Sequence, residues 1–232
     1  MNSSVALIPM PDDPEVPEPM RGRCVYHVRI AYTGDAAEGE RLVAPLREAG
    51  PVLLEMLRDM PYTESASIHD EPPVPLPFQR ETTMLREVSD DVLRTLLEHA
   101  GPQAPVPCVV ELRHLGGAVA EPPEHPNPVA HRDAPYLLSV VTLLVGITAE
   151  DTRGVYEKLF EALEPFSSGA GLNFLGFGAN AGENRVRVAY APTDLERLAR
   201  LKAGDDPQNL FRLNYNIPRP PMRPRRTDGE PP

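Results

Sequence analysis

The sequence predicts an α+β fold with a mainly antiparallel sheet and helices packed on one face. Short runs typical of strands alternate with helical patterns in an irregular order: strand, helices, weak strand, helix, two strands, helix, two strands, helix. With 232 residues, of which 41% are hydrophobic, the chain can bury a substantial core in one domain. This mixture of elements fits an α+β domain, and no internal repeat stands out.

Proline marks where the chain is expected to be irregular. The 29 prolines gather in the first 20 residues, around residues 72–77 and 122–128, and after residue 217. Clustering of this kind indicates loops and tails rather than disorder throughout. We therefore predict a flexible lead-in at residues 1–20 and a disordered tail at residues 219–232.

Charge and hydropathy exclude several classes of protein. A net charge of -11 argues against a nucleic-acid partner, which requires clustered positive charge. The apolar run at residues 136–147 is too short to span a bilayer, and residues 1–19 lack the basic and apolar regions of a signal peptide. Cys24 and Cys108 lie in apolar runs without CxxC spacing and are predicted to be reduced core thiols. A cytoplasmic protein without a membrane partner is expected.

The first third of the chain begins with a strand. Residues 24–32 alternate between apolar and polar side chains, which predicts a strand with one covered face. Asp35 is predicted to cap a helix that ends at Gly50, and residues 52–57 are predicted to form a second helical piece. Residues 61–88 are predicted to be irregular, with a possible short strand at 65–69.

The middle of the chain carries clearer signals. Ser89 is predicted to cap a helix over residues 90–100. Residues 108–115 are predicted to form a strand. Residues 136–147 are continuously apolar, as a strand covered on both faces would be. Thr148, with Asp151 behind it, is predicted to cap the next helix.

The chain is expected to close with two strands and a helix. The strands are predicted at residues 172–177 and 185–189, and Thr193 is predicted to cap the helix, with Glu196 as its capping-box partner. Asn214 and Asn216 lie two residues apart, so in an extended segment both would point to the same side. Two buried amides on one side require hydrogen-bond partners.

Residues 190–218 resemble the C-terminal element of the berberine-bridge-enzyme-like FAD-linked oxidoreductases, of the vanillyl-alcohol oxidase superfamily. The agreement consists of many spaced positions: Tyr190, Arg197-Leu198, Lys202, Asp-Pro-Gln-Asn-Leu-Phe-Arg at 206–212 and Asn-Tyr-Asn-Ile-Pro at 214–218. Upstream, further landmarks follow in the family's order, at residues 32–35, 45–47, 60–62, 115–118 and 131–132. The resemblance covers about residues 20–220.

The resemblance implies a division of the chain and a set of site residues. Residues 21–189 would form the substrate-binding (cap) domain, and residues 190–218 the closing element. FAD is the implied cofactor, and a small molecule the implied substrate. The residues implied to face the cofactor are Asn173, Tyr190, Asn214 and Asn216, and those implied on the substrate side are His69, His131 and Arg132.

Each of these residues also has an ordinary structural interpretation. Asn173 would be a satisfied amide at a sheet end, and Asn214 and Asn216 would bind neighbouring backbone. Tyr190 would simply pack, and Arg132 would form a surface ion pair with Asp133. The histidines show no spacing typical of a metal site.

The sequence also departs from the family's pattern. No glycine-rich loop that follows a strand and opens a helix is found, so the FAD-binding domain has no counterpart. Many relatives carry Tyr-x-Asn-Tyr where this chain has Gly171, Leu172, Asn173 and Phe174, so a hydroxyl that assists proton abstraction is missing. No catalytic base is identified.

The resulting prediction is the C-terminal part of an FAD-dependent oxidoreductase. It would shape the substrate side of a flavin site for hydride transfer from a small organic substrate. It would be inactive alone unless a separate FAD-binding domain docks in trans, and it could associate as a homo-oligomer. The alternative is a non-catalytic α+β module that binds a small molecule or a partner, as a truncated remnant.

Overall fold

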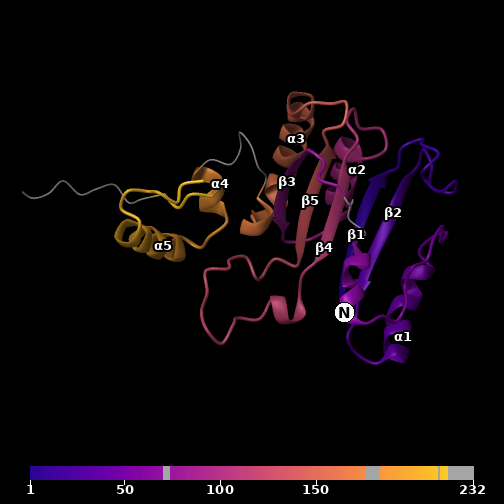
Figure 1. Ribbon diagram of the computed structural model, residues 1–232, viewed down its shortest axis with the longest axis horizontal. Coiled ribbons are helices and arrows are strands. Elements are labelled where there is room, and N and C mark those ends of the chain that lie inside the picture. The colour runs from indigo at the N-terminus through magenta and orange to yellow at the C-terminus, as the bar shows by residue number, and fades with distance from the viewer. Residues whose placement is uncertain (70–73, 176–182, 214, 219–232) are drawn as a thin grey trace, which may run out of the picture.

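The computed structural model describes residues 1–69, 74–175, 183–213 and 215–218, and its centre is one antiparallel sheet (Figure 1). Its six strands lie in the order β2-β1-β4-β5-β3-β6, and every pairing is antiparallel. The strands are β1 (Asn2–Pro9), β2 (Cys24–Ala31), β3 (Phe78–Leu85), β4 (Val109–His114), β5 (Tyr136–Leu143) and β6 (Ser167–Gly169). The α+β prediction is confirmed.

Helices complete the domain. The α-helices are α1 (Ala36–Arg47), α2 (Asp90–Ala100), α3 (Ala149–Leu163), α4 (Glu183–Val188) and α5 (Pro192–Asp205). Short 3-10 turns are η1 (Tyr62–Ile68), η2 (Gly117–Val119), η3 (Glu164–Phe166) and η4 (Leu172–Phe174). In Figure 1, α2 and α3 lie against the middle of the sheet, whereas α4 and α5 stand to its side. Among the described residues, no helix combines the length and apolarity needed to cross a membrane.

The core lies between the sheet and the pair α2 and α3. Alternate positions of the central strands face the two helices, and the largest fully buried side chains include Leu85, Leu138 and Leu159. Both helices begin where local chemistry predicts: Ser89 accepts from a first-turn amide, and Thr148 forms a capping box with Asp151. Strong local caps and apolar stripes explain why these elements were predictable.

The first residues of the chain correct one prediction. Residues 2–9, expected within a flexible lead-in, form β1, which pairs with β2 on one side and β4 on the other. Ala6 and Leu7 are buried there. Pro9 ends this strand, and the other prolines of residues 1–20 follow it, in the turns that lead into β2.

Two further differences concern residues 52–85. β3 was missed inside the segment predicted to be irregular, although its second half is fully buried. The possible strand at 65–69 is instead the 3-10 turn η1, and residues 52–57 form no helix. Exposed aliphatic side chains at residues 52–57 show that this segment has no core to pack against.

The C-terminal part differs most from the predictions. The strand expected at residues 185–189 is the helix α4, and the one expected at 172–177 begins as η4, with residues 176–177 outside the described residues. Helix α5 begins after Ala191 with Pro192 in its first turn, so Thr193 lies inside the helix and does not cap it. The tail at residues 219–232 lies outside the described residues.

A small apolar cluster crosses the predicted boundary between residues 189 and 190. Ala170, Leu175 and Ala189 are buried together, and Tyr190 and Tyr215 pack against them. Because this cluster includes side chains from both sides of the boundary, the described residues 170–175 and 189–190 pack together with Tyr215 beside the sheet (Figure 1).

Candidate functional site: the polar face of the sheet

The sheet face opposite α2 and α3 carries polar side chains, and we call it the polar face. Strand register places two rows of side chains across it. One row consists of His27, Ala6, Glu111, Ser139 and Thr82, and the next of Arg29, Ser4, Arg113, Leu137 and Met84. Charged residues on β2 and β4, with Ser4 of β1 between them, are thereby brought onto one surface.

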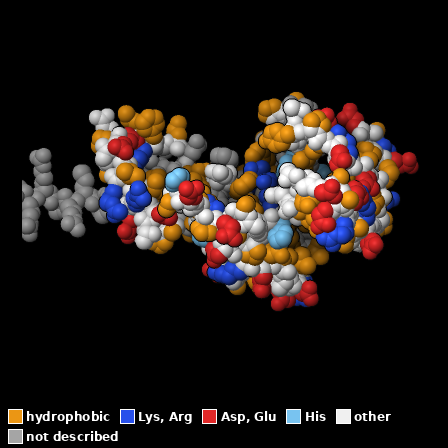
Figure 2. All heavy atoms as spheres, turned by 90° about the horizontal axis from the view of Figure 1, so that it is seen from below, with side chains coloured by type: hydrophobic (Ala, Val, Ile, Leu, Met, Phe, Trp, Pro, Cys, Tyr) orange, Lys and Arg blue, Asp and Glu red, His pale blue; other side chains and the backbone are white. Residues whose placement is uncertain are grey.

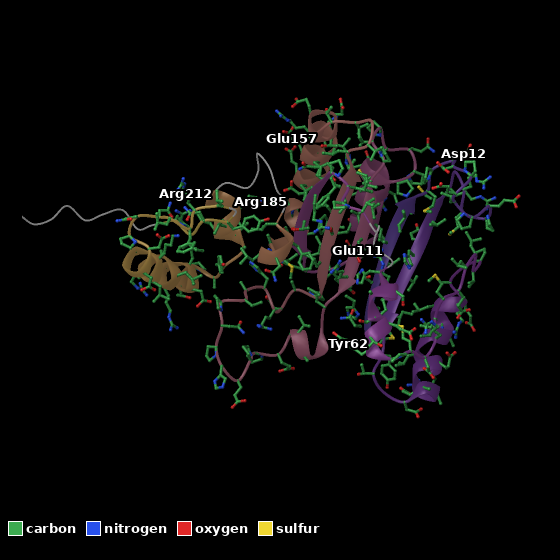
Figure 3. The ribbon with its side chains drawn as sticks, viewed as in Figure 1. Asp12, Tyr62, Glu111, Glu157, Arg185 and Arg212 are labelled. Carbon is green, nitrogen blue, oxygen red and sulfur yellow. The ribbon has the colours of Figure 1, made fainter. Side chains whose placement is uncertain are left out.

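Glu111 is the centre of this face (Figure 3). Its Oε1 accepts from Arg29 Nη1 at 2.9 Å and from the Ser4 hydroxyl at 3.0 Å, and its Oε2 accepts from Arg113 Nε at 3.0 Å. The Glu111 side chain is 10% exposed, that of Arg29 14% and that of Arg113 30%. We call Ser4, Arg29, Glu111 and Arg113 the arginine cluster, of which Arg113 extends furthest toward solvent.

The charge state of Glu111 follows from these contacts. Burial raises the pKa of the carboxyl, but the hydrogen bond and charge of Arg113, the charge of Arg29 and the Ser4 hydroxyl together outweigh it. The net pKa lies below its ordinary value, so Glu111 is ionised at neutral pH. A carboxylate held in this way is a weak proton acceptor.

An apolar patch adjoins the arginine cluster. Met84, Ala134 and Leu137 are buried together, with Leu115 and Phe174 packed against them. The guanidinium carbon of Arg113 lies 4.9 Å from the centroid of the Phe174 ring, a cation–π contact. The charged cluster and the apolar patch are therefore continuous.

A pocket of about 580 Å³ opens at the end of β4. Two of its lining residues, Leu115 and Ala134, also belong to the apolar patch. The remaining lining residues come from the connection between β4 and β5: Gly116, Ala120, Pro122, Val129, His131, Arg132, Asp133 and Pro135. The pocket thus extends the polar face toward α4.

His131 and Arg132, predicted on the substrate side, both line this pocket. His131 has a positive φ of 57° and its Nε2 lies 2.8 Å from the carbonyl oxygen of Val188. Arg132 donates to the carbonyl oxygen of Val119 and to Asn127 Oδ1. Both side chains therefore hold the pocket's loop in place, and Arg132 forms no ion pair with Asp133 among the described residues.

Gly169 allows the approach of His131. A Cβ at Gly169 would lie 2.2 Å from the imidazole Cε1, and φ at this residue is +139°. Any side chain at this position would push the ring away. The imidazole of His131 in the pocket wall therefore packs directly against Gly169 of the short strand β6.

The other predicted residues lie elsewhere. Asn173 is exposed in η4, and His69 follows η1 near β2, at the edge of the sheet opposite β6. Tyr190 packs against the small cluster around Leu175, and burial raises the pKa of its hydroxyl. Asn214 lies outside the described residues. The structure brings His131 and Arg132 together in one pocket, whereas His69 lies near the opposite edge of the sheet.

The C-terminal part and strand β3 beside it offer unpaired polar atoms for a bound group. Arg80 Nε, Arg185 Nη2 and Asn216 Oδ1 are buried without hydrogen-bond partners among the described residues. Arg185 also pairs with Glu81 through its other nitrogen, and the Tyr215 hydroxyl donates to the Leu175 carbonyl. Unpaired donors and an unpaired acceptor fit the polar edge of a flavin ring. Among the described loops that open an α-helix, none carries more than one glycine, so none is suited to a diphosphate.

An exposed apolar segment follows α5. The Asp206 carboxylate accepts from the amides of Leu210 and Phe211 at 2.7 and 3.1 Å and pairs with Lys202, whose Nζ also binds the Phe211 carbonyl at 2.6 Å. These bonds fix the turn, yet Leu210, Phe211 and Leu213 are 65, 81 and 83% exposed. Figure 2 shows hydrophobic side chains at the surface of the part that carries α5. We call residues 210–213 the apolar turn.

The arginine cluster was missed by sequence reasoning, although a signal existed. Alternation within β2 predicted that Arg29 lies on the less apolar face of its strand. The same alternation places Glu111 and Arg113 on one face of β4. Their meeting depends on β1, which lies between the two strands and was not predicted.

Comparisons with known proteins agree on one family. Residues 172–218 match the family model described as berberine and berberine like. An FAD-linked oxidoreductase from Dictyostelium discoideum is 23% identical over 198 residues, which cover 82% of this chain and 42% of that protein. The resemblance inferred from the sequence is confirmed.

Solved structures share the fold. A carbohydrate oxidase from Microdochium nivale superposes with a TM-score of 0.68 at 15% identity, and 6-hydroxy-D-nicotine oxidase from Arthrobacter nicotinovorans with 0.66 at 20% identity. Each alignment covers 94% of this chain and 48% of the other. The chain spans about half the length of these proteins, and less than half of the Dictyostelium relative.

Proposed function

We propose, from the similarity of this chain to berberine-like FAD-linked oxidoreductases, that it forms the substrate side of such an enzyme. The observation that carries the proposal is the family match over residues 172–218, in a chain that aligns along 94% of its length to two oxidases. The reaction class is oxidation of a small organic substrate with FAD as the acceptor. The proposal places the substrate between the polar face and the flavin.

FAD, when bound, would supply the acceptor for a hydride from a substrate carbon. The residues of this chain would bind and orient. Arg80, Arg185 and Asn216, with their buried unpaired atoms, would hold the polar edge of the ring, and Asn173, Tyr190 and Asn214 are further candidates by resemblance. Around them, Phe174 and the apolar patch would exclude water from the reacting carbon.

A second domain is part of the proposal. The described residues fit a ring edge and not a diphosphate, so the remainder of FAD would be held by a separate FAD-binding domain. The apolar turn is the surface we assign to that contact, because three large apolar side chains are exposed there on a turn that Asp206 holds rigid. A second copy of this chain is the competing occupant.

Flavin retention tests the proposal. The chain would be mixed with FAD, alone and together with the separately expressed FAD-binding half of the Dictyostelium relative, and passed through gel filtration. We expect the flavin absorption band to travel with this chain only in the mixture, and oxygen consumption to require a substrate. Phe211→Asp should abolish co-elution of this chain with the FAD-binding half. Leu201→Asp, on the exposed side of α5, should leave that co-elution intact. Failure to retain flavin with this partner and with the cognate FAD-binding half would remove the cofactor from the proposal.

Two observations favour a non-catalytic binding module as the second candidate. Gly171 stands where many relatives carry the assisting tyrosine, and Glu111 is held ionised by two arginines. A module of this kind would bind a small molecule without consuming oxygen in any flavin-loaded mixture. The same gel-filtration samples, assayed for ligand binding and for oxygen uptake, separate the two candidates.

A further inference from the structure

We propose that the polar face binds a small organic acid, whose carboxylate pairs with Arg113 and whose apolar body lies against Phe174 and Leu115, the partly exposed side chains of the apolar patch. This inference rests on the proposed function, because it names the substrate class for the face that the proposal assigns to the substrate. It depends on three features of the described residues: charge, unpaired donors and an adjoining apolar surface.

The arginine cluster carries excess positive charge. Two guanidinium groups meet the single carboxylate of Glu111, in a chain whose net charge is -11. Among the described residues, no second carboxylate pairs with these two guanidinium groups, and burying a charge without a counter-charge is unfavourable. A ligand carboxylate would supply the missing negative charge.

Unpaired donors remain in the cluster after Glu111 is satisfied. Arg29 Nε is buried and has no partner among the described residues. Arg113 directs Nε and Nη2 at Glu111, and no hydrogen bond from its Nη1 to another described residue is found. Because Arg113 is the most exposed member, its free edge is the one that an incoming anion reaches first.

The surface next to Arg113 suits an apolar body. The Phe174 ring lies beneath the guanidinium group, with 4.9 Å between its centroid and the guanidinium carbon of Arg113. The ring also contacts the patch around Leu137. Leu115 and Ala134 continue that patch into the pocket of about 580 Å³. A planar acid of the benzoate type would place its carboxylate at Arg113 and its ring over apolar side chains.

Benzoate is therefore the probe, with benzyl alcohol as its neutral counterpart. Binding to the full chain would be followed by calorimetry and by the shift in thermal unfolding, at constant ionic strength and without FAD. We expect saturable benzoate binding and a rise in melting temperature that benzyl alcohol does not produce. Equal responses to the two compounds, or none, would overturn the inference.

Variants give responses of opposite sign. Arg113→Gln should weaken benzoate binding about tenfold or more. Arg113→Lys keeps the positive charge but loses the two parallel N–H donors of the guanidinium group, so its affinity for benzoate should lie between those of the wild type and Arg113→Gln. Glu111→Gln should tighten benzoate binding, because it removes the internal carboxylate that competes for the arginines. Arg94→Gln, an exposed arginine on α2 that pairs with Asp91, is the matched control and should leave binding unchanged.

These outcomes separate a ligand site from a purely structural cluster. A structural cluster predicts that Arg113→Gln and Glu111→Gln both destabilise the protein and that neither changes the benzoate response, which would refute the inference. If Arg113→Gln does not fold, the benzoate affinity of Arg113→Lys and the comparison of benzoate with benzyl alcohol decide whether the cluster binds a ligand. Since no flavin is present, failure here leaves the flavin-retention test unaffected, and failure of that test leaves this one unaffected.

Discussion

Replacing Glu111 by glutamine tests whether the arginine cluster is held together by charge. Glutamine keeps the shape of the side chain but removes the negative charge that binds Arg29 and Arg113, and it turns an amide donor toward a guanidinium group. Removing one partner of a buried ion pair costs about 3–5 kcal/mol. Because the Arg113 side chain is 30% exposed, water replaces part of the hydrogen bonding that its guanidinium group loses with the Glu111 carboxylate, which lowers the cost. We therefore expect a loss of about 3 kcal/mol in the free energy of unfolding at pH 7.

The same variant has a defined pH dependence. The folded pKa of Glu111 lies below its ordinary value of 4.5, so the carboxylate stabilises the fold fully above about pH 4.5. That contribution disappears as the pH falls through the lower folded pKa. The difference between wild type and Glu111→Gln should hence be constant near neutral pH and shrink in acid.

Urea unfolding at several pH values measures both effects. The matched control is Glu157→Gln, an exposed carboxylate on α3 for which no ion pair with another described residue is found (Figure 3). It should change the free energy of unfolding by less than about 0.5 kcal/mol. The charge-based explanation would be refuted if Glu111→Gln lowered the free energy of unfolding at pH 7 by no more than the control does. It would also be refuted if a larger loss persisted unchanged in acid.

Three further variants address the core and the C-terminal turn. Leu159→Ala in α3, a fully buried position, should cost about 3–4 kcal/mol in urea unfolding, whereas Leu201→Ala at a half-exposed position should cost far less. Tyr156→Phe removes a buried hydroxyl bonded to the carbonyl oxygen of Val140 and should cost about 1–2 kcal/mol by the same measurement; no loss would show that this bond is not stabilising. Asp206→Asn should speed hydrogen exchange at the two amides that its carboxylate binds, whereas the same change at Asp205 should leave those amides protected.

Elements with strong local signals were predictable from the sequence. Ser89 and Thr148 cap their helices as expected, because a capping side chain binds an amide only a few residues away. β1 was missed because the prolines that follow it dominated the composition of residues 1–20. The segment at residues 185–188, Arg-Val-Arg-Val, alternates like a strand, yet it lies in α4, whose Val186 is buried. Alternation over so few residues does not decide between the two structures.

The candidate site was harder to predict, for a physical reason. Arg29 and Glu111 are separated by 82 residues and meet only because β1 fills the place between their strands. The contact is a property of strand order and register, which local sequence does not carry. The resemblance pointed to Asn173 and Tyr190, whose roles toward a cofactor stay predictions. It gave no indication of the arginine cluster.

The two faces of the sheet differ in how their polar groups are satisfied. One face is closed by α2 and α3, and the polar groups buried there, such as the Tyr156 hydroxyl, are satisfied within the fold. On the other face, among the described residues, two guanidinium groups share the single carboxylate of Glu111. Folding alone would favour a second carboxylate or an apolar pair at this position, since either would avoid the unbalanced charge. The imbalance is accounted for if a ligand carries the missing charge, as proposed above, and the benzoate measurements test this explanation.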